Sequence, residues 1–391
     1  MEDRPVSAKK QCPVKEIIAN DVEALAGVDA ELPHKVPKVD KERCEQIVGS
    51  ALPYKGPLVL ILGDGNLSFS CTLASMYPAF RITATVIENE EEFRARYPSG
   101  ADILEEITKM PNIELKFCID ATALPEEWSD YNDIIFNFPH PGGKTNLKRS
   151  RELMCNVFSS LQRLMTREDC RFHLSLAKRQ SGLDHSYVID QRYVSLDIPS
   201  HNKDSWQIIY IAASYGLLVN AVVPFNPADF KQYVSSGYKK RDQKFWNKDA
   251  ADLISFFKAP QVDVTLPSPM TDSSDEDSLC FPKRFHSFRP FFLHDISIIF
   301  GSQVQEDMNH YESVLFRFIR SRTPDLVIDC REVEELRCIC PKTKRPNRIY
   351  RLYWQSVNKP LHRTDCNKLQ NYLRCAISQF FSSEHVPLTL T

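Results

Sequence analysis

The hydrophobic positions between residues 57 and 225 form short apolar runs that alternate with amphipathic stretches. Apolar runs of strand length predict strands over residues 57–62, 82–87, 113–118, 132–138, 171–177 and 217–225. Apolar residues at helical spacing predict helices over residues 67–77, 90–110 (broken at Pro98), 146–165 and 205–216. This alternation predicts a parallel sheet covered on both faces, whose ligands lie beyond the carboxyl ends of its strands.

A second region with a different order of elements follows an acidic stretch. Residues 267–280, PSPMTDSSDEDSLC, contain four acids and no base, and this composition predicts a solvated linker. Beyond it we expect a strand (288–300), a helix (310–321), two strands joined by a basic loop (327–356) and a second helix (363–381). The chain is thus predicted to divide into an extension of uncertain structure (1–50), an α/β domain (51–266), the linker (267–280) and an α+β domain (281–391).

Composition indicates a soluble globular protein, with 42% hydrophobic and 26% charged residues. No apolar run approaches the roughly 18–20 residues that a membrane-spanning helix needs. The opening residues, MEDRPVSAKKQCPVKE, lack the apolar core of a signal peptide. We therefore expect a protein of the cytoplasm, the nucleolus or both, neither secreted nor in a membrane. The 12 cysteines include one close pair, Cys338-Ile339-Cys340, and their spacing predicts reduced thiols and no metal site.

The net charge of −2 hides a basic tail. Residues 281–391 contain 17 basic and 11 acidic residues, a net charge of 17 − 11 = +6. Basic residues that cluster on a surface are the usual partners of nucleic-acid phosphates. The candidates are Lys239, Lys240, Arg241, Lys342, Lys344, Arg345 and Arg348. A solvated face is the simpler interpretation of any one of them alone.

Two glycines one residue apart follow the first predicted strand, in LVLILGDGNLSFS (58–70). A dinucleotide fingerprint would have a third glycine where this chain has Ser68. A ligand that lacks a pyrophosphate but needs close backbone approach therefore fits better, and S-adenosylmethionine is such a ligand. The residues assigned to it in this loop are Gly63, Asp64, Gly65, Asn66 and Ser68.

Two carboxylates extend this cofactor hypothesis. Glu88 follows the second strand, where an acid would bind the ribose hydroxyls, and Asp120 follows the third, where it would flank the adenine. For either residue alone, a surface carboxylate in a loop is the better explanation. Acids at successive strand ends, beside the glycine loop, favour the cofactor site.

The fourth predicted strand ends in the turn Asn137-Phe138-Pro139-His140, within IIFNFPHPGGK. Methyltransferases that act on planar nitrogens commonly carry an Asn/Asp-Pro-Pro-aromatic turn at this place. We predict that Asn137 reads a base edge, that Pro139 shapes the turn and that His140 stacks on the base or accepts a proton. A β-turn closed by proline and glycine is the structural alternative.

These motifs together resemble two known families. ILGDGNLSFS, CIDAT, NDIIFNFPHPGGK, SWQIIYIAASYGL and GYKKRDQKF, within residues 57–258, resemble the eukaryotic large-subunit rRNA (uridine-N3) methyltransferase-like domain. The tail resembles the ferredoxin-fold anticodon-binding domain of phenylalanyl-tRNA synthetases. Asp64 and Leu67 replace a glutamate and an aromatic residue of the first family, and residues 177–204 lack its Gln-Gly-Gly. The resemblance implies a Rossmann-like class I methyltransferase domain followed by a ferredoxin-like α+β domain.

The function implied is S-adenosylmethionine-dependent methylation of RNA, with uridine N3 of rRNA as the first candidate target and tRNA as the second candidate partner. The target base would have to be exposed in a loop or flipped from its stack. A non-catalytic RNA-binding protein with a degenerate methyltransferase domain remains open from the sequence. A dinucleotide-dependent oxidoreductase is disfavoured by Ser68, and a synthetase by the lack of an adenylation core before the tail.

Overall fold

The computed structural model describes residues 54, 56–143, 146–183, 194–196, 198–199, 201–236, 251–267, 281–301 and 307–391. The predicted extension (1–50), most of the predicted linker and the candidate residues Lys239, Lys240 and Arg241 lie outside these ranges.

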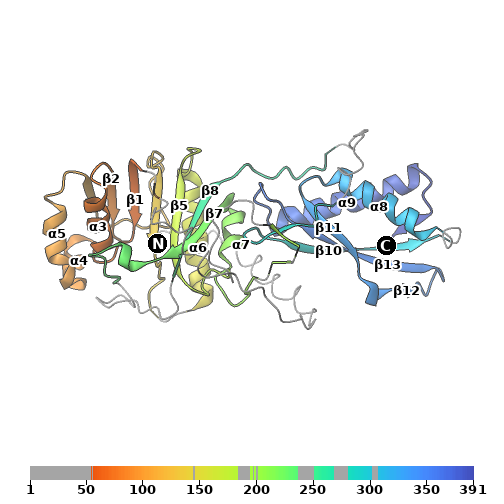
Figure 1. Ribbon diagram of the computed structural model, residues 1–391, viewed down its shortest axis with the longest axis horizontal. Helices are drawn as coiled ribbons and strands as arrows, with labels where there is room; N and C mark the ends of the chain where they lie inside the picture. Colours follow the sequence, from red (N-terminus) through yellow and green to blue (C-terminus); the bar gives the residue numbers. More distant parts are fainter. Residues whose placement is uncertain are drawn as a thin grey trace, which may run out of the picture. The chain divides into compact units, whose positions relative to one another are not determined.

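A seven-stranded sheet forms the first folded region, in the order β3-β2-β1-β4-β5-β8-β7 (Figure 1). Its strands are β1 (Leu58–Leu62), β2 (Arg81–Thr85), β3 (Ile113–Lys116), β4 (Asp133–Asn137), β5 (Arg171–Ala177), β7 (Leu217–Phe225) and β8 (Ala251–Lys258). Its helices are α3 (Ser68–Met76), α4 (Glu90–Arg96), α5 (Ala101–Ile107), α6 (Leu147–Leu164) and α7 (Ile208–Ser214). A single 3-10 turn, Pro98–Gly100, separates α4 from α5, so the predicted break at Pro98 is confirmed.

The expectation of an all-parallel sheet is wrong at one strand. β8 lies between β5 and β7 and pairs antiparallel with both. Its sequence, ADLISFFK, is almost wholly buried. Because β7 and β8 run in opposite directions, they pair without a crossover helix between them. The remaining strands follow the α/β order in which β1 and β4 meet at the centre, where the chain reverses its direction across the sheet.

A buried polar network ties three of these strands together. The Asp133 carboxylate lies 2.8 Å from His173 Nε2, and His173 Nδ1 lies 2.8 Å from the Ser255 hydroxyl. The Gly56 amide donates to the other oxygen of Asp133 at 2.7 Å. Although the residue types match a nucleophilic triad, Asp133, His173 and Ser255 are each at most 2% exposed. No substrate reaches the hydroxyl, so the network serves the stability of the sheet.

The tail folds around a second, antiparallel sheet in the order β11-β13-β10-β14, with β12 paired to β13 (Figure 1). The strands are β10 (Phe292–Phe300), β11 (Val327–Glu332), β12 (Cys338–Ile339), β13 (Pro346–Trp354) and β14 (Leu388–Leu390), and the helices are α8 (Met308–Arg322) and α9 (Arg363–Ser383). Leaving aside the short β12, the chain order is β-α-β-β-α-β, which confirms the ferredoxin-like prediction. A core shared by both helices and the sheet includes Leu315, Leu373 and Trp354.

Candidate cofactor and acceptor site

A cavity of about 560 Å³ lies at the carboxyl ends of the central strands. The candidate residues that line it are Gly63, Asp64, Gly65, Asn66, Glu88, Asp120, Asn137, Pro139 and His140. These residues come from loops after β1, β2, β3 and β4, which the parallel arrangement brings to one edge. Of the residues predicted to bind the cofactor or the acceptor base, all of which the structure describes, Ser68 alone does not line the cavity.

The glycine loop is shaped by a segment far away in the sequence, residues 233–236. Gly63 has φ +56, a conformation that side chains disfavour. A Cβ on Gly65 would lie 2.6 Å from the Ser236 hydroxyl, and the Asn66 amide donates to that hydroxyl at 2.9 Å. The close approach of Ser236 therefore explains, at least in part, why position 65 is a glycine. The segment 233–236 also lines the cavity, so the loop and the segment form one wall.

The Ser68 hydroxyl joins this wall to the start of α3. It donates to the Val234 carbonyl and accepts from the Val234 amide, each at 3.0 Å, and Ser68 is 2% exposed. The position of the missing third glycine therefore holds an anchor for residues 233–236. Any contribution of Ser68 to cofactor binding would be indirect.

Asp64 connects the cavity to the same helix. Its carboxylate accepts a hydrogen bond from the Ser70 amide in the first turn of α3, at 2.6 Å. Burial raises the pKa of Asp64, and the hydrogen bonds from Ser70 oppose that rise. An acidic side chain at the amino end of a helix complements the helix dipole.

The two other acids differ in their surroundings. Glu88 is 5% exposed and pairs with Arg96 of α4, which also lines the cavity. Asp120 is exposed, and one of its oxygens accepts from both the amide and the hydroxyl of Thr122 at 2.8 Å. One oxygen of each carboxylate is thus engaged within the protein.

At the end of β4, the two polar atoms of the Asn137 amide differ: the oxygen has a hydrogen-bond partner and the nitrogen has none within the described part of the chain. The Ser175 hydroxyl donates to Asn137 Oδ1 at 2.6 Å. Asn137 Nδ2 is buried and has no hydrogen-bond partner among the described residues. The next residue, Phe138, has φ 49, a strained conformation for a bulky side chain. Unsatisfied donors and strained backbone concentrate at functional sites, and here they are adjacent.

The His140 ring is oriented by its own turn. The Gly142 amide donates to His140 Nδ1 at 2.9 Å. Nδ1 is therefore the acceptor, and the neutral ring carries its proton on Nε2. Abstraction of a proton by Nε2 would require the other tautomer and the loss of this contact.

Several lining residues were missed by the sequence analysis. They include Ile87, Phe136, Gln180, Trp206 and the segment Tyr233–Ser236. Asn66 and Ser236 are 170 residues apart, so no local spacing could connect them. Gln180 follows β5 in a stretch where the sequence analysis noted only the lack of Gln-Gly-Gly, so its place in the chain was the available signal.

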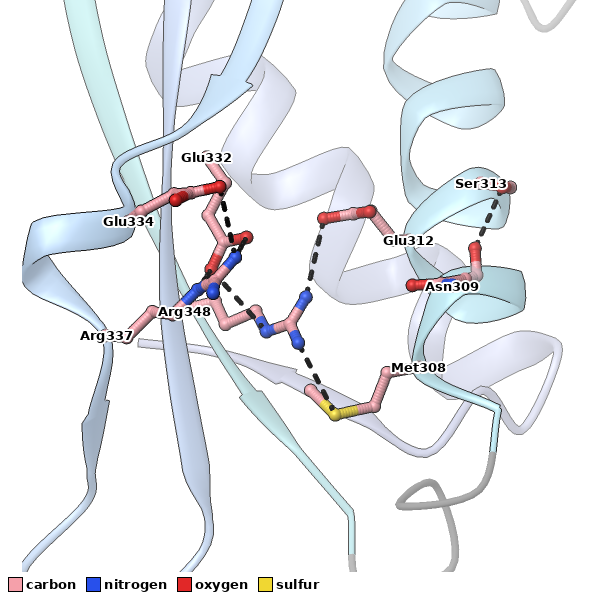
Figure 2. Close-up of polar contacts among 8 residues, drawn as sticks. All are labelled: Met308, Asn309, Glu312, Ser313, Glu332, Glu334, Arg337 and Arg348. Carbon is pink, nitrogen blue, oxygen red and sulfur yellow. Dashed lines mark hydrogen bonds and ion pairs between the residues drawn. The ribbon is translucent and has the colours of Figure 1, made fainter.

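The candidate phosphate-binding residues of the tail fall into two groups. Lys342, Lys344 and Arg345 are exposed in the turn between β12 and β13. Figure 2 shows that Arg348 instead points toward Glu312 of α8 and Glu332 of β11, at 3.8 and 3.5 Å. Its side chain is 19% exposed and lies 5.5 Å from the Phe300 ring centroid. The structure therefore commits Arg348 to contacts within the domain.

Glu332 is also held by Arg337, through two hydrogen bonds of 2.7 Å (Figure 2). These bonds lower the pKa of Glu332, against the opposing effect of its partial burial. The cluster thus ties Arg337, which precedes β12, and Arg348 of β13 to Glu332 of β11.

Within the described residues there is no group of three or more His, Cys, Asp or Glu side chains placed to hold a metal ion. Among the helices of this part of the chain, none is both long and apolar enough to cross a membrane.

The strand order and the position of the cavity define the first domain as an α/β fold of the class I methyltransferase type, followed by a ferredoxin-like domain. Residues 60–237 match the model of a family described as BMT5-like, rRNA (uridine-N3-)-methyltransferase, and the chain belongs to this family.

Relatives share the match over about half of this chain. Ferredoxin-fold anticodon-binding domain-containing protein 1 homolog from Mus musculus is 29% identical over 204 residues, 50% of this chain and 30% of the mouse protein. The uncharacterized protein At4g26485 from Arabidopsis thaliana is 30% identical over 195 residues, 48% of this chain and 86% of the plant protein. The matched part thus spans less than a third of the mouse relative's length.

Among solved structures, the 16S rRNA (adenine(1408)-N(1))-methyltransferase from Catenulisporales acidiphilia is 16% identical. The structural match covers 57% of this chain and 94% of the bacterial chain, with a TM-score of 0.30.

Proposed function

We propose that this protein is an S-adenosylmethionine-dependent RNA methyltransferase that methylates N3 of uridine in rRNA, and that its ferredoxin-like domain binds RNA. The observation that carries the proposal is the cavity at the central strand ends, which joins a Gly-Asp-Gly loop to an unsatisfied amide donor of Asn137. Family membership supports the reaction class.

The lining residues suit the proposed cofactor. A cavity of about 560 Å³ lies within the usual range for small-molecule sites, about 300–1,000 Å³. Gly63 offers bare backbone, and Asp64 carries an acid that would attract a sulfonium cation. Glu88 and Asp120 would bind hydroxyl and amino groups through the oxygens not engaged within the protein. When bound, the cofactor supplies an activated methyl group.

The acceptor side of the cavity suits uracil. N3 of uracil lies between two carbonyl oxygens, and the turn at the end of β4 offers the Nδ2 donor of Asn137. S-adenosylmethionine bound in this cavity would supply the methyl group to N3, its sulfur would keep the electron pair of the broken bond, and the N3 proton would pass to solvent. The residues that line the cavity would hold N3 of uracil in line with the methyl group and the sulfur.

The glycine loop gives a first prediction. Gly65→Val is expected to displace residues 233–236, because even a Cβ would lie 2.6 Å from the Ser236 hydroxyl. The affinity for S-adenosylmethionine, measured by calorimetry, should fall at least tenfold, about 1.4 kcal/mol. Gly65→Ala should be partly rescued by Ser236→Ala, which removes the opposing oxygen. Unchanged affinity in a folded Gly65→Val variant would take this loop out of the site.

The exposed basic turn gives a second prediction. The triple variant Lys342→Ala, Lys344→Ala, Arg345→Ala should weaken RNA binding and reduce the salt dependence of the binding constant, by a slope of about 2 to 3 if each residue contacts a phosphate. The charge-matched control is Lys283→Ala, Arg317→Ala, Lys368→Ala, whose residues are exposed elsewhere in the domain. Equal effects of the two triple variants would mean that the turn is not a specific RNA contact.

The proposed activity is tested by incubating the full chain with methyl-labelled S-adenosylmethionine and total RNA. Transfer of label to RNA is expected. Binding of RNA or cofactor without transfer of label to either rRNA or tRNA would mean that the protein is a binding protein with a degenerate methyltransferase domain.

A further inference from the structure

The amide group of Asn137 is held in one orientation by a residue that does not line the cavity. Asn137 of β4 and Ser175 of β5 are register partners in adjacent parallel strands, so their side chains lie on the same face of the sheet. The Ser175 hydroxyl donates to Asn137 Oδ1 at 2.6 Å, and Ser175 is completely buried. The Ser175 carbonyl also accepts from the Phe138 amide at 2.9 Å. Ser175 therefore anchors both the side chain and the turn that follows it.

We infer that Ser175 is a positioning residue that sets the base specificity of the site. This inference rests on the proposed methyltransferase function and assigns a role to a residue outside the cavity. Because Oδ1 is occupied by the serine hydroxyl, the arm of the amide left for a ligand is Nδ2. Nδ2 can only donate a hydrogen bond, so a base that binds there must present a hydrogen-bond acceptor beside the nitrogen that is methylated.

The consequence is a choice between nucleobases. Uracil has a carbonyl oxygen on each side of N3, and either oxygen can accept the hydrogen bond of Nδ2. Cytosine has an amino group on one side of N3, and adenine has one beside N1. In those orientations that set an amino group against Nδ2, two donors would face each other with neither satisfied. Selectivity then arises both from the contact that uracil makes and from the contact that the amino bases cannot make.

Rotation of the amide by half a turn would reverse this selectivity. The rotated side chain would present Oδ1 to the ligand and accept from an amino group. The contact of 2.6 Å from a fully buried hydroxyl opposes that rotation, because a buried hydroxyl without its partner is costly. A side chain without a hydroxyl at position 175 would release the amide to adopt either orientation.

The test compares Ser175→Ala with Ser175→Thr, which keeps a hydroxyl. Each variant is assayed on short RNAs that differ only in the target base. Ser175→Ala should transfer methyl to uridine about tenfold more slowly, the loss expected for one hydrogen bond, with unchanged cofactor affinity. The preference of Ser175→Ala for uridine over cytidine should also become smaller. Ser175→Thr should keep most of the wild-type rate and most of the wild-type preference. Wild-type rate and selectivity in folded Ser175→Ala would overturn the inference.

A second measurement does not depend on turnover. In protein labelled with 15N-asparagine, the Asn137 side-chain amide signal is identified by its loss in Asn137→Asp. That signal should shift in Ser175→Ala and return toward its wild-type position in Ser175→Thr. A signal unmoved by Ser175→Ala would overturn the inference. Absence of methyl transfer by the wild type on any RNA would instead overturn the proposed function, so the two failures are distinguishable.

Discussion

Asn137→Ala is expected to reduce methyl transfer about a hundredfold, the loss typical of removing one donor that acts in the transition state. The affinity for S-adenosylmethionine should stay close to that of the wild type, because the unsatisfied Nδ2 is assigned to the acceptor base. A fall in the rate constant with cofactor binding retained indicates lost positioning of the acceptor. The measurement pairs labelled methyl transfer with calorimetry.

Two controls make this result interpretable. Asn226→Ala removes an asparagine that caps the 3-10 turn at Pro227–Asp229 and does not line the cavity, so transfer should be nearly unchanged. Thermal unfolding shows whether Asn137→Ala remains folded, since Ser175 loses its partner. Full activity in folded Asn137→Ala would remove this residue from the chemistry. His140→Ala should cost less, because the ring, whose Nδ1 accepts from the Gly142 amide, is assigned a stacking role.

His173→Leu is expected to lower the free energy of unfolding by about 3–5 kcal/mol, because it leaves the buried Asp133 carboxylate without the imidazole that lies 2.8 Å away. Chemical denaturation monitored by fluorescence would measure the change. Ser255→Ala is the milder comparison, expected to cost about 1–3 kcal/mol, because it leaves one buried nitrogen of His173 unsatisfied. A loss below about 1 kcal/mol in His173→Leu would contradict the structural role given to this network.

The elements that could be predicted from sequence are those with a strong local pattern. The apolar run LVLIL and the helical spacing of residues 147–164 each specify one element, and both formed close to the expected bounds. β8 was not predicted, because the identity of an apolar run such as ADLISFFK depends on the strands that it pairs with. Its antiparallel insertion between β5 and β7 is decided by long-range pairing.

The candidate site divides in the same way. Residues that follow strands, such as Gly63, Glu88 and Asn137, could be placed together from the order of strands alone. The roles of Ser68 and Ser236 could not, because their partners are 166 and 170 residues away. Arg348 belongs to the same basic run as Lys344, and the difference between them arises from Glu312 and Glu332, which folding brings to Arg348. Charge along a sequence does not show which cations are already neutralised.

Methylation of uridine N3 in RNA can be tested directly by nucleoside analysis after methyl transfer. Ribosomal RNA is incubated with the full chain and labelled S-adenosylmethionine, digested to nucleosides and separated by chromatography with mass detection. We expect the label to appear in 3-methyluridine and Asn137→Ala to remove most of it. Label found in a methylated adenosine or cytidine, with none in 3-methyluridine, would contradict it.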